Sequence, residues 1–200
     1  MKKIFYILTI FLFKFNIAYS LIEVDITRGN LDPLPIAVSP LHVDPQSNNY
    51  QDVKIKELGE LISSVVEKNF RSTGLFNPLN KDAFVQKPDI AHLKPRFEDW
   101  SLITAQALVT GKLLIKDEKL KIEFRLWDVA ANKEMIALAF TTTPSNWRRV
   151  AHIISDKIYE RLTGETGYFD TRIIYVSETG LKTQRVKKLA IMDQDGENTK

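Results

Sequence analysis

Residues 105–143 read AQALVTGKLLIKDEKLKIEFRLWDVAANKEMIALAFTTT, and this stretch decides the fold class of the 200-residue chain. It holds three β-rich runs separated by KDE and AAN, connections short enough for hairpins. In the second run, Leu120, Ile122, Phe124 and Leu126 alternate with polar residues and so share one face. The stretch therefore predicts an antiparallel meander of three strands.

Two helices are predicted on either side of the meander. Apolar residues recur at intervals of three and four from Val53 to Phe70, and Gly74 supplies a stop signal. A second helix is expected to start at Pro144 with Ser145 as its N-cap and to end at Gly164. Its inner stripe consists of Trp147, Ala151, Ile154, Ile158 and Leu162.

Further strands are predicted before the meander. A buried strand is expected at Ile36 to Ser39 and a short extended piece at residues 75–79. Residues 80–95 are polar and interrupted by prolines, which favours loops with one helical turn among them. The predicted class is α+β, with a mixed sheet of about five strands and two helices packed on it.

The first twenty residues have the build of a cleavable signal peptide. Lys2 and Lys3 precede an apolar run that Lys14 interrupts, and the segment ends in Ala18-Tyr19-Ser20. Small residues at these last positions predict cleavage between Ser20 and Leu21, and hence export. The alternative, an uncleaved anchor, would need about 20 apolar residues to span a bilayer.

Charge and cysteine content narrow the possible partners. The chain has 28 Lys and Arg against 25 Asp and Glu, and the leader alone carries three lysines and no acid. The mature chain is therefore neutral, which argues against nucleic acid as a partner. With no cysteine in the sequence, neither a disulfide nor a thiolate ligand is expected.

Residues with catalytic or metal-binding potential are scattered. His42, His92 and His152 have no second ligand at metal-binding spacing, and His152 is expected to be a packed or surface residue. No phosphate loop or nucleophile elbow is present in the sequence. A hydrolase that uses carboxylates is an alternative, but the acidic pairs fall at predicted turns. We therefore predict no enzyme, no cofactor and no metal.

The first residues after the predicted cleavage site alternate in polarity. Leu21 begins the segment, Ile22, Val24 and Ile26 are apolar, and Glu23, Asp25 and Thr27 are polar. This period predicts a half-buried strand. Two interpretations remain open: an edge strand of the chain's own sheet, or a strand given to another protein by β-augmentation.

The composition changes after Gly167. FDTRIIYVSE (169–178) and RVKKLAIMDQDG (185–196) read as two more strands around a turn at Gly180, with no helix left to cover them. We place a domain boundary at residues 164–167, which separates a domain at 21–165 from a segment at 166–200.

Four pieces of the chain resemble the periplasmic TolB family of the Tol-Pal envelope system. They are LIEVDITRGNLDPLPIAVSP (21–40), RSTGLFNPL (71–79), SDKIYERLTGETGYFDTRIIYV (155–176) and AIMDQDG (190–196). The phrase RLTGETGYFDTRIIYV is the most specific, because it joins the end of a helix to a strand. The resemblance covers Leu21 to Lys200.

The resemblance implies a fold, partners and a location. TolB-like proteins carry an N-terminal domain similar to anticodon-binding domains, followed by a six-bladed β-propeller, so residues 166–200 would be the first strands of that propeller. An isolated hairpin is marginal in water, so we expect it to be loosely ordered or docked on the domain. The family implies periplasmic protein binding: residues 21–27 and their domain would engage the C-terminal domain of TolA. The propeller, of which this truncated start would hold only the first strands, would bind Pal in the full-length family. Nucleic-acid binding of the anticodon type is the alternative.

Overall fold

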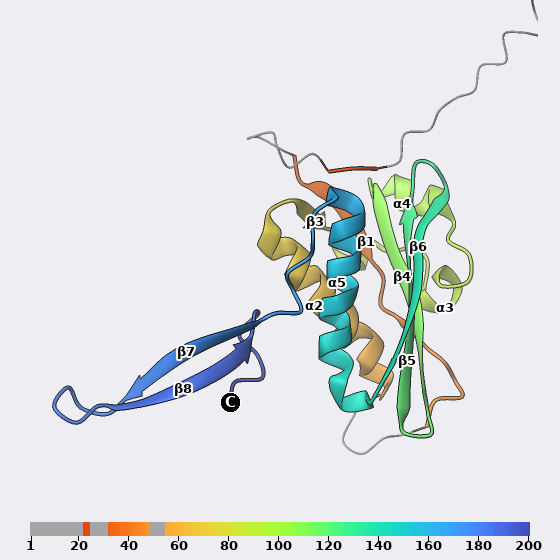
Figure 1. The fold of residues 1–200 in the computed structure, drawn as a ribbon. Helices are drawn as coiled ribbons and strands as arrows, with labels where there is room; N and C mark the ends of the chain where they lie inside the picture. Colours follow the sequence, from red (N-terminus) through yellow and green to blue (C-terminus); the bar gives the residue numbers. More distant parts are fainter. Residues whose placement is uncertain (1–21, 25–31, 49–54) are drawn as a thin grey trace, which may run out of the picture.

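The computed structural model describes residues 22–24, 32–48 and 55–200. The predicted signal peptide lies outside these residues. Figure 1 shows a sheet seen edge-on with helices on both sides of it, and a long hairpin on the far side of the helices from the sheet. Within the described residues, no helix is long and apolar enough to cross a membrane.

The sheet is mixed, as predicted. Its main path is β3-β1-β4-β5-β6, and β2 pairs with β4 beyond the end of β1. β1 runs parallel to both β3 and β4, whereas β4, β5 and β6 are antiparallel. The strands are β1 (Leu34–Val38), β2 (His42–Val43), β3 (Phe76–Pro78), β4 (Ala107–Lys116), β5 (Lys119–Asp128) and β6 (Lys133–Thr142).

The meander of β4, β5 and β6 confirms the prediction from alternating polarity. Asp117 and Glu118 form the two-residue turn between β4 and β5, and both have positive φ, at 50° and 58°. Such left-handed residues give a hairpin turn the twist that its strands need. β6 has its second long side open to solvent, and residues 136–142 of this edge carry no charged side chain.

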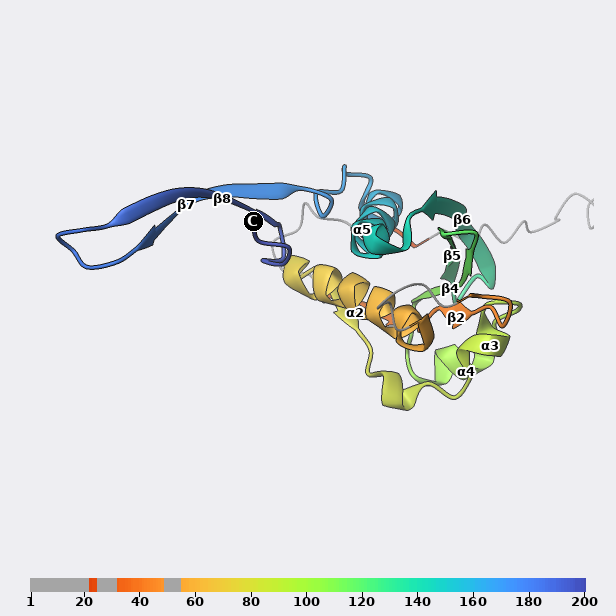
Figure 2. The same ribbon diagram turned by 90° about the horizontal axis from the view of Figure 1, so that it is seen from below.

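Two long helices cover one face of the sheet and enclose the main core (Figure 2). They are α2 (Ile55–Thr73) and α5 (Trp147–Thr163). Leu120, Ile122, Phe124 and Leu126 of β5 point into this core and are at most 1% exposed. Phe70 of α2 is fully buried there. Burial of this apolar surface is the main force that holds the helices on the sheet.

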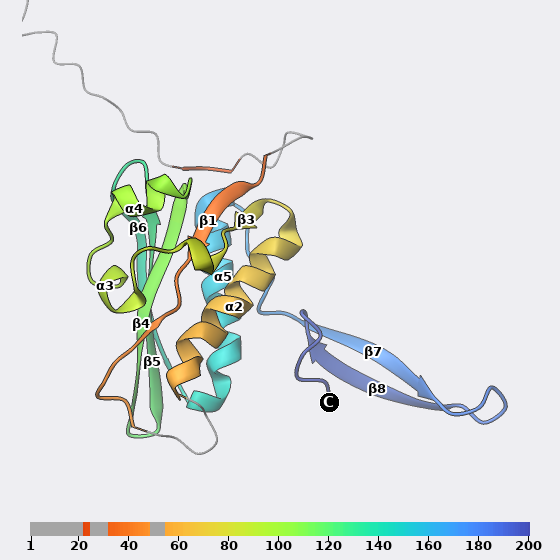
Figure 3. The same ribbon diagram turned by 180° about the vertical axis from the view of Figure 1, so that it is seen from behind.

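A smaller core lies on the opposite face of the sheet, on the side where Figure 3 shows two short helices. The short helices α3 (Pro88–Ala91) and α4 (Phe97–Leu102) cover it, and Trp100 is its largest buried side chain. The Gln86 amide oxygen accepts hydrogen bonds from Trp100 Nε1 at 3.0 Å and from the Arg96 N–H at 2.9 Å. α4 was not predicted from the sequence.

The ends of the two long helices agree only in part with the sequence predictions. Gly164 ends α5 in the left-handed conformation with φ of 77°, as predicted. Ser145 as N-cap is wrong: the cap is Asn146, and Pro144–Asn146 form a separate 3₁₀ turn, η2. The reason is that Pro144 starts this tighter turn, inside which the Ser145 hydroxyl contacts Thr143 Oγ1 at 3.2 Å. The first long helix begins at Ile55 among the described residues, and Val53 lies outside them.

The chain ends in an antiparallel hairpin of β7 (Arg172–Thr179) and β8 (Val186–Asp193). It is a two-stranded sheet separate from the main one. Its strands expose apolar side chains, among them Ile174, Val176 and Leu189. Only the base of the hairpin meets the helices, through residues 193–195 and the stretch just before β7.

Candidate partner-binding site

The described part of the leading segment, residues 22–24, lies across one end of α5 and β5. The Val24 N–H donates to the Leu162 carbonyl at 2.7 Å, and the Ile22 N–H donates to Asp128 Oδ2 at 3.2 Å. None of these three residues belongs to a strand, so the predicted half-buried strand is wrong for them. Leu21, Asp25, Ile26 and Thr27 lie outside the described residues.

The side chains of this segment keep the alternation seen in the sequence. Ile22 and Val24 are half-buried and pack against the main core, while Glu23 is exposed. Backbone hydrogen bonds and alternate apolar side chains are also what a strand offers to a partner sheet. The segment is therefore docked on its own domain through the same groups that strand addition would use.

Leu162 can hold the segment because it lies in the last turn of α5. The last four carbonyls of a helix have no partner within the helix. The Gly164 N–H donates a hydrogen bond to the Glu160 carbonyl, and the Val24 N–H donates one to the Leu162 carbonyl. The end of α5 thus supplies a backbone acceptor for an extended segment.

Asp128 is the second anchor, and the sequence analysis did not identify it. Asp128 is 1% exposed. Its Oδ2 accepts a hydrogen bond from the Ile22 N–H, and its Oδ1 accepts one from the Ala131 N–H at 2.8 Å. One buried carboxylate therefore joins the β5–β6 turn to the leading segment. The available signal was an aspartate at the end of a strand before a turn, where this residue commonly accepts a backbone hydrogen bond.

His152, Asp193 and Asp195 form a second polar cluster, at the base of the hairpin. One ligand-type atom from each lies within 4.8 Å of the other two. His152 is buried, which decides between the two expected places, packed or on the surface, and the sequence spacing gave no sign of its two acidic neighbours. Arg148 forms an ion pair with Asp195, and Arg172 Nε lies 3.8 Å from Asp193 Oδ1. Two arginine side chains therefore lie beside the carboxylates of this cluster.

His42 and His92 also meet, on the other side of the sheet. Their rings stack with centroids 4.4 Å apart and an angle of 4° between the planes. Burial lowers the pKa of His42, and the neighbouring His92 lowers it further. His92 Nδ1 is held by the Pro88 carbonyl at 2.9 Å. Beside them is a shallow hollow of about 200 Å³, with Gly111, Ala137 and Ala139 in its lining.

Comparison with known proteins identifies the family. The model of the TolB amino-terminal domain matches residues 22–135. The chain belongs to the TolB family. The TolB resemblance recognised in the sequence is thereby confirmed.

Relatives of known name agree with this assignment. "Tol-Pal system protein TolB" of Pelagibacter ubique (strain HTCC1062) is 71% identical over 185 residues, which is 92% of this chain and 42% of that protein. The crystal structure of TolB from Acinetobacter baumannii matches 90% of this chain and 41% of that chain, with a TM-score of 0.67 and 24% identity. The chain thus spans about two fifths of the length of both relatives.

Proposed function

We propose that this TolB-family chain is a periplasmic, protein-binding component of the Tol-Pal system. In this proposal Leu21–Thr27 adds as a strand to the C-terminal domain of TolA, and the β-propeller that follows the domain in the family binds Pal. The system would then support outer-membrane integrity and constriction during cell division. The protein would approach membranes only through its partners, after export by cleavage between Ser20 and Leu21.

The observation that carries the proposal is the docking of residues 22–24 by two backbone N–H groups at the edge of the domain. Of the described residues of the segment, Ile22 and Val24 pack against the core, and none belongs to the sheet or to a helix. We therefore expect its release to leave the sheet and helices intact. The 71% identity with a Tol-Pal system protein supports the choice of partner system.

Binding, and not catalysis, is the proposed activity. The polar clusters of the described residues are closed by their own contacts: Asp195 by Arg148, Asp193 by Arg172, and Asp128 by two backbone N–H groups. We therefore assign no catalytic residue, cofactor, metal or small-molecule substrate.

Replacing Val24 with proline tests the segment. Val24→Pro removes the N–H that a strand would donate, whereas Val24→Ala keeps it and serves as the matched control. Titration calorimetry with the C-terminal domain of TolA should show lost or strongly reduced binding for Val24→Pro and for deletion of residues 21–27, and retained binding for Val24→Ala. Unchanged TolA binding after the deletion would refute the site.

Nucleic-acid binding remains the alternative, and ionic strength separates the two. A complex led by phosphate contacts loses about 10³-fold or more in affinity between about 50 and 200 mM salt. Strand addition should be far less sensitive, because it rests on backbone hydrogen bonds and apolar contacts. A steep loss of TolA affinity over this range would contradict the proposal, as would salt-sensitive RNA binding that outlasts the deletion of residues 21–27.

A further inference from the structure

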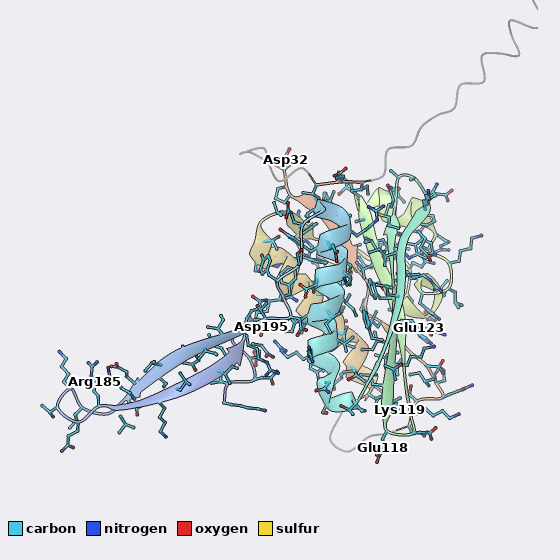
Figure 4. The ribbon with its side chains drawn as sticks, viewed as in Figure 1. Asp32, Glu118, Lys119, Glu123, Arg185 and Asp195 are labelled. Atoms are coloured by element: carbon cyan, nitrogen blue, oxygen red, sulfur yellow. The ribbon has the colours of Figure 1, made fainter. Side chains whose placement is uncertain are left out.

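The hairpin is exposed along its length and buried at its base. Arg185 lies near the far tip, and Asp195 lies beside α5 at the near end (Figure 4). Leu189 in β8 is 77% exposed, whereas the side chain of Asp195 is 2% exposed. An acidic side chain that is buried to this degree needs partners that offset its lost hydration.

Asp195 meets a notch between α2 and α5 whose side chains are Lys68, Asn69, Arg148 and His152. The Arg148 guanidinium donates a hydrogen bond to Asp195 Oδ2, and His152 Nε2 lies 3.7 Å from the same oxygen. Lys68 Nζ donates to the Asp195 carbonyl at 3.2 Å. Both the side chain and the backbone of Asp195 thus meet cationic or donor groups.

A hydrogen-bond network orients His152 toward this carboxylate. Gln194 Nε2 donates to Asn69 Oδ1 at 3.2 Å, and Asn69 Nδ2 donates to Ser155 Oγ at 2.9 Å. The same Asn69 nitrogen lies 3.0 Å from His152 Nδ1, which therefore accepts and leaves the ring proton on Nε2. Among the described residues Nε2 has no hydrogen-bond partner, and Asp195 Oδ2 at 3.7 Å is an acceptor near it. The notch thus aims an unpaired donor at Asp195.

The ionisation of these groups agrees with that geometry. Burial is the main reason why the pKa of His152 lies below its usual value, so the ring is neutral at pH 7. Burial alone would raise the pKa of Asp195, but the hydrogen bond and charge of Arg148 bring it below the usual value. The notch therefore holds one carboxylate with one guanidinium.

A second attachment holds the chain just before β7. Asp156 of α5 accepts hydrogen bonds from the Phe169 N–H at 2.7 Å and from the Asp170 N–H at 3.1 Å. Phe169 is fully buried in the main core. Arg149 of the same helix adds an ion pair there, with its Nε 3.1 Å from Asp170 Oδ1. All of these contacts lie at one point, at the start of the hairpin. A second point is needed to set its direction.

We propose that the notch of Lys68, Asn69, Arg148 and His152 is a carboxylate-binding site for Asp195, and that this contact sets the orientation of the β7–β8 hairpin on the α/β domain. The site recognises the charged side chain and the carbonyl of Asp195 in a tight turn, and Gln194 beside it adds one hydrogen bond to Asn69. The inference is independent of TolA and Pal.

The absence of cysteine from the sequence makes a direct test possible. Spin labels are placed through Lys182→Cys near the hairpin tip and Thr141→Cys on β6, both exposed positions. Pulsed dipolar spectroscopy then measures the distance distribution between them. We expect one narrow peak in the labelled parent and a broad distribution once Asp195→Asn removes the charge.

Matched variants separate this contact from general loss of charge. Glu178→Gln removes an acid of the same hairpin that pairs with Arg185 at 2.6 Å and Lys187 at 2.8 Å, and it should keep the narrow peak. Arg148→Met should broaden the distribution as Asp195→Asn does, and the double variant should be no broader than either. Unchanged circular dichroism confirms that each variant is folded.

Three results would overturn the proposal. One is a narrow peak that persists in Asp195→Asn, and another is a distribution that is already broad in the parent. The third is saturable Zn²⁺ binding by the unchanged chain that His152→Gln abolishes, because the carboxylates would then be metal ligands.

Discussion

β5 and the β7–β8 hairpin are all strands rich in apolar residues, but their surroundings are opposite. The inner side chains of β5 are at most 1% exposed, whereas Ile174, Val176 and Leu189 of the hairpin are 58–77% exposed. β5 lies beneath α2 and α5, and the hairpin meets those helices only at its base. Local sequence therefore predicts that a segment is a strand, while distant parts of the chain decide whether that strand is buried.

The largest change in the free energy of unfolding is expected on the buried face of β5. Phe124→Ala removes a ring that is 1% exposed and stacked on Phe140, with centroids 6.1 Å apart. Chemical denaturation should show a loss of about 3–5 kcal/mol in the free energy of unfolding. Lys121→Ala, on the exposed face of the same strand, is the control and should change it by less than about 0.5 kcal/mol. Equal losses in both variants would contradict the assigned faces.

A smaller loss of stability is expected from a substitution in α2, at the point where this helix approaches the chain before β2. A Cβ atom added at Gly59 would lie 2.0 Å from the Leu41 carbonyl oxygen. Alanine normally stabilises a helix relative to glycine, but here it must displace backbone. Gly59→Ala should therefore cost about 1–3 kcal/mol in thermal or chemical unfolding.

Lys56→Ala, at an exposed position of the same helix, is the control for that change. It should leave the free energy of unfolding within about 0.5 kcal/mol of the parent. A more stable Gly59→Ala variant would show that α2 can move away from Leu41, and so would weaken the contrast between a tightly covered sheet and an uncovered hairpin.

The smallest effect is expected in the hairpin. Leu189→Thr replaces a side chain that is 77% exposed with one that still favours a strand. The free energy of unfolding should change by less than about 0.5 kcal/mol in this chain. Val176→Thr, its cross-strand neighbour, should behave alike. A loss above about 2 kcal/mol in either would mean that this face is covered in solution.

Much of the fold was predictable because its determinants are local. Alternating side chains identified the meander, and Gly164 marked the end of α5 with its left-handed backbone. α4 was not predicted because its six residues are too few to show a helical period. Its N-cap, Arg96, and two residues of its first turn, Glu98 and Asp99, are also charged. Ser145 was misjudged because a 3₁₀ turn at Pro144 delays the helix.

The contacts of the candidate sites were less predictable. The segment 21–27 was identified by its alternation, but its docking depends on Asp128 and Leu162, which are distant in the sequence. His152 is likewise joined to Asp195 only by the packing of the hairpin base against α5. Sequence spacing carries no information about such pairs, because only tertiary structure brings them together. Partner binding by residues 21–27 stays a prediction.

The mixed sheet has a consequence for the order of folding. β4, β5 and β6 are joined by tight turns, so their pairing closes small loops and loses little chain entropy. β1 and β4 are far apart in the sequence, because α2 and both short helices lie between them, and yet Ile36 pairs with Ala107. Contacts between distant residues form slowly. The meander is therefore the expected nucleus, and φ-values should be high at its turns and low along β1.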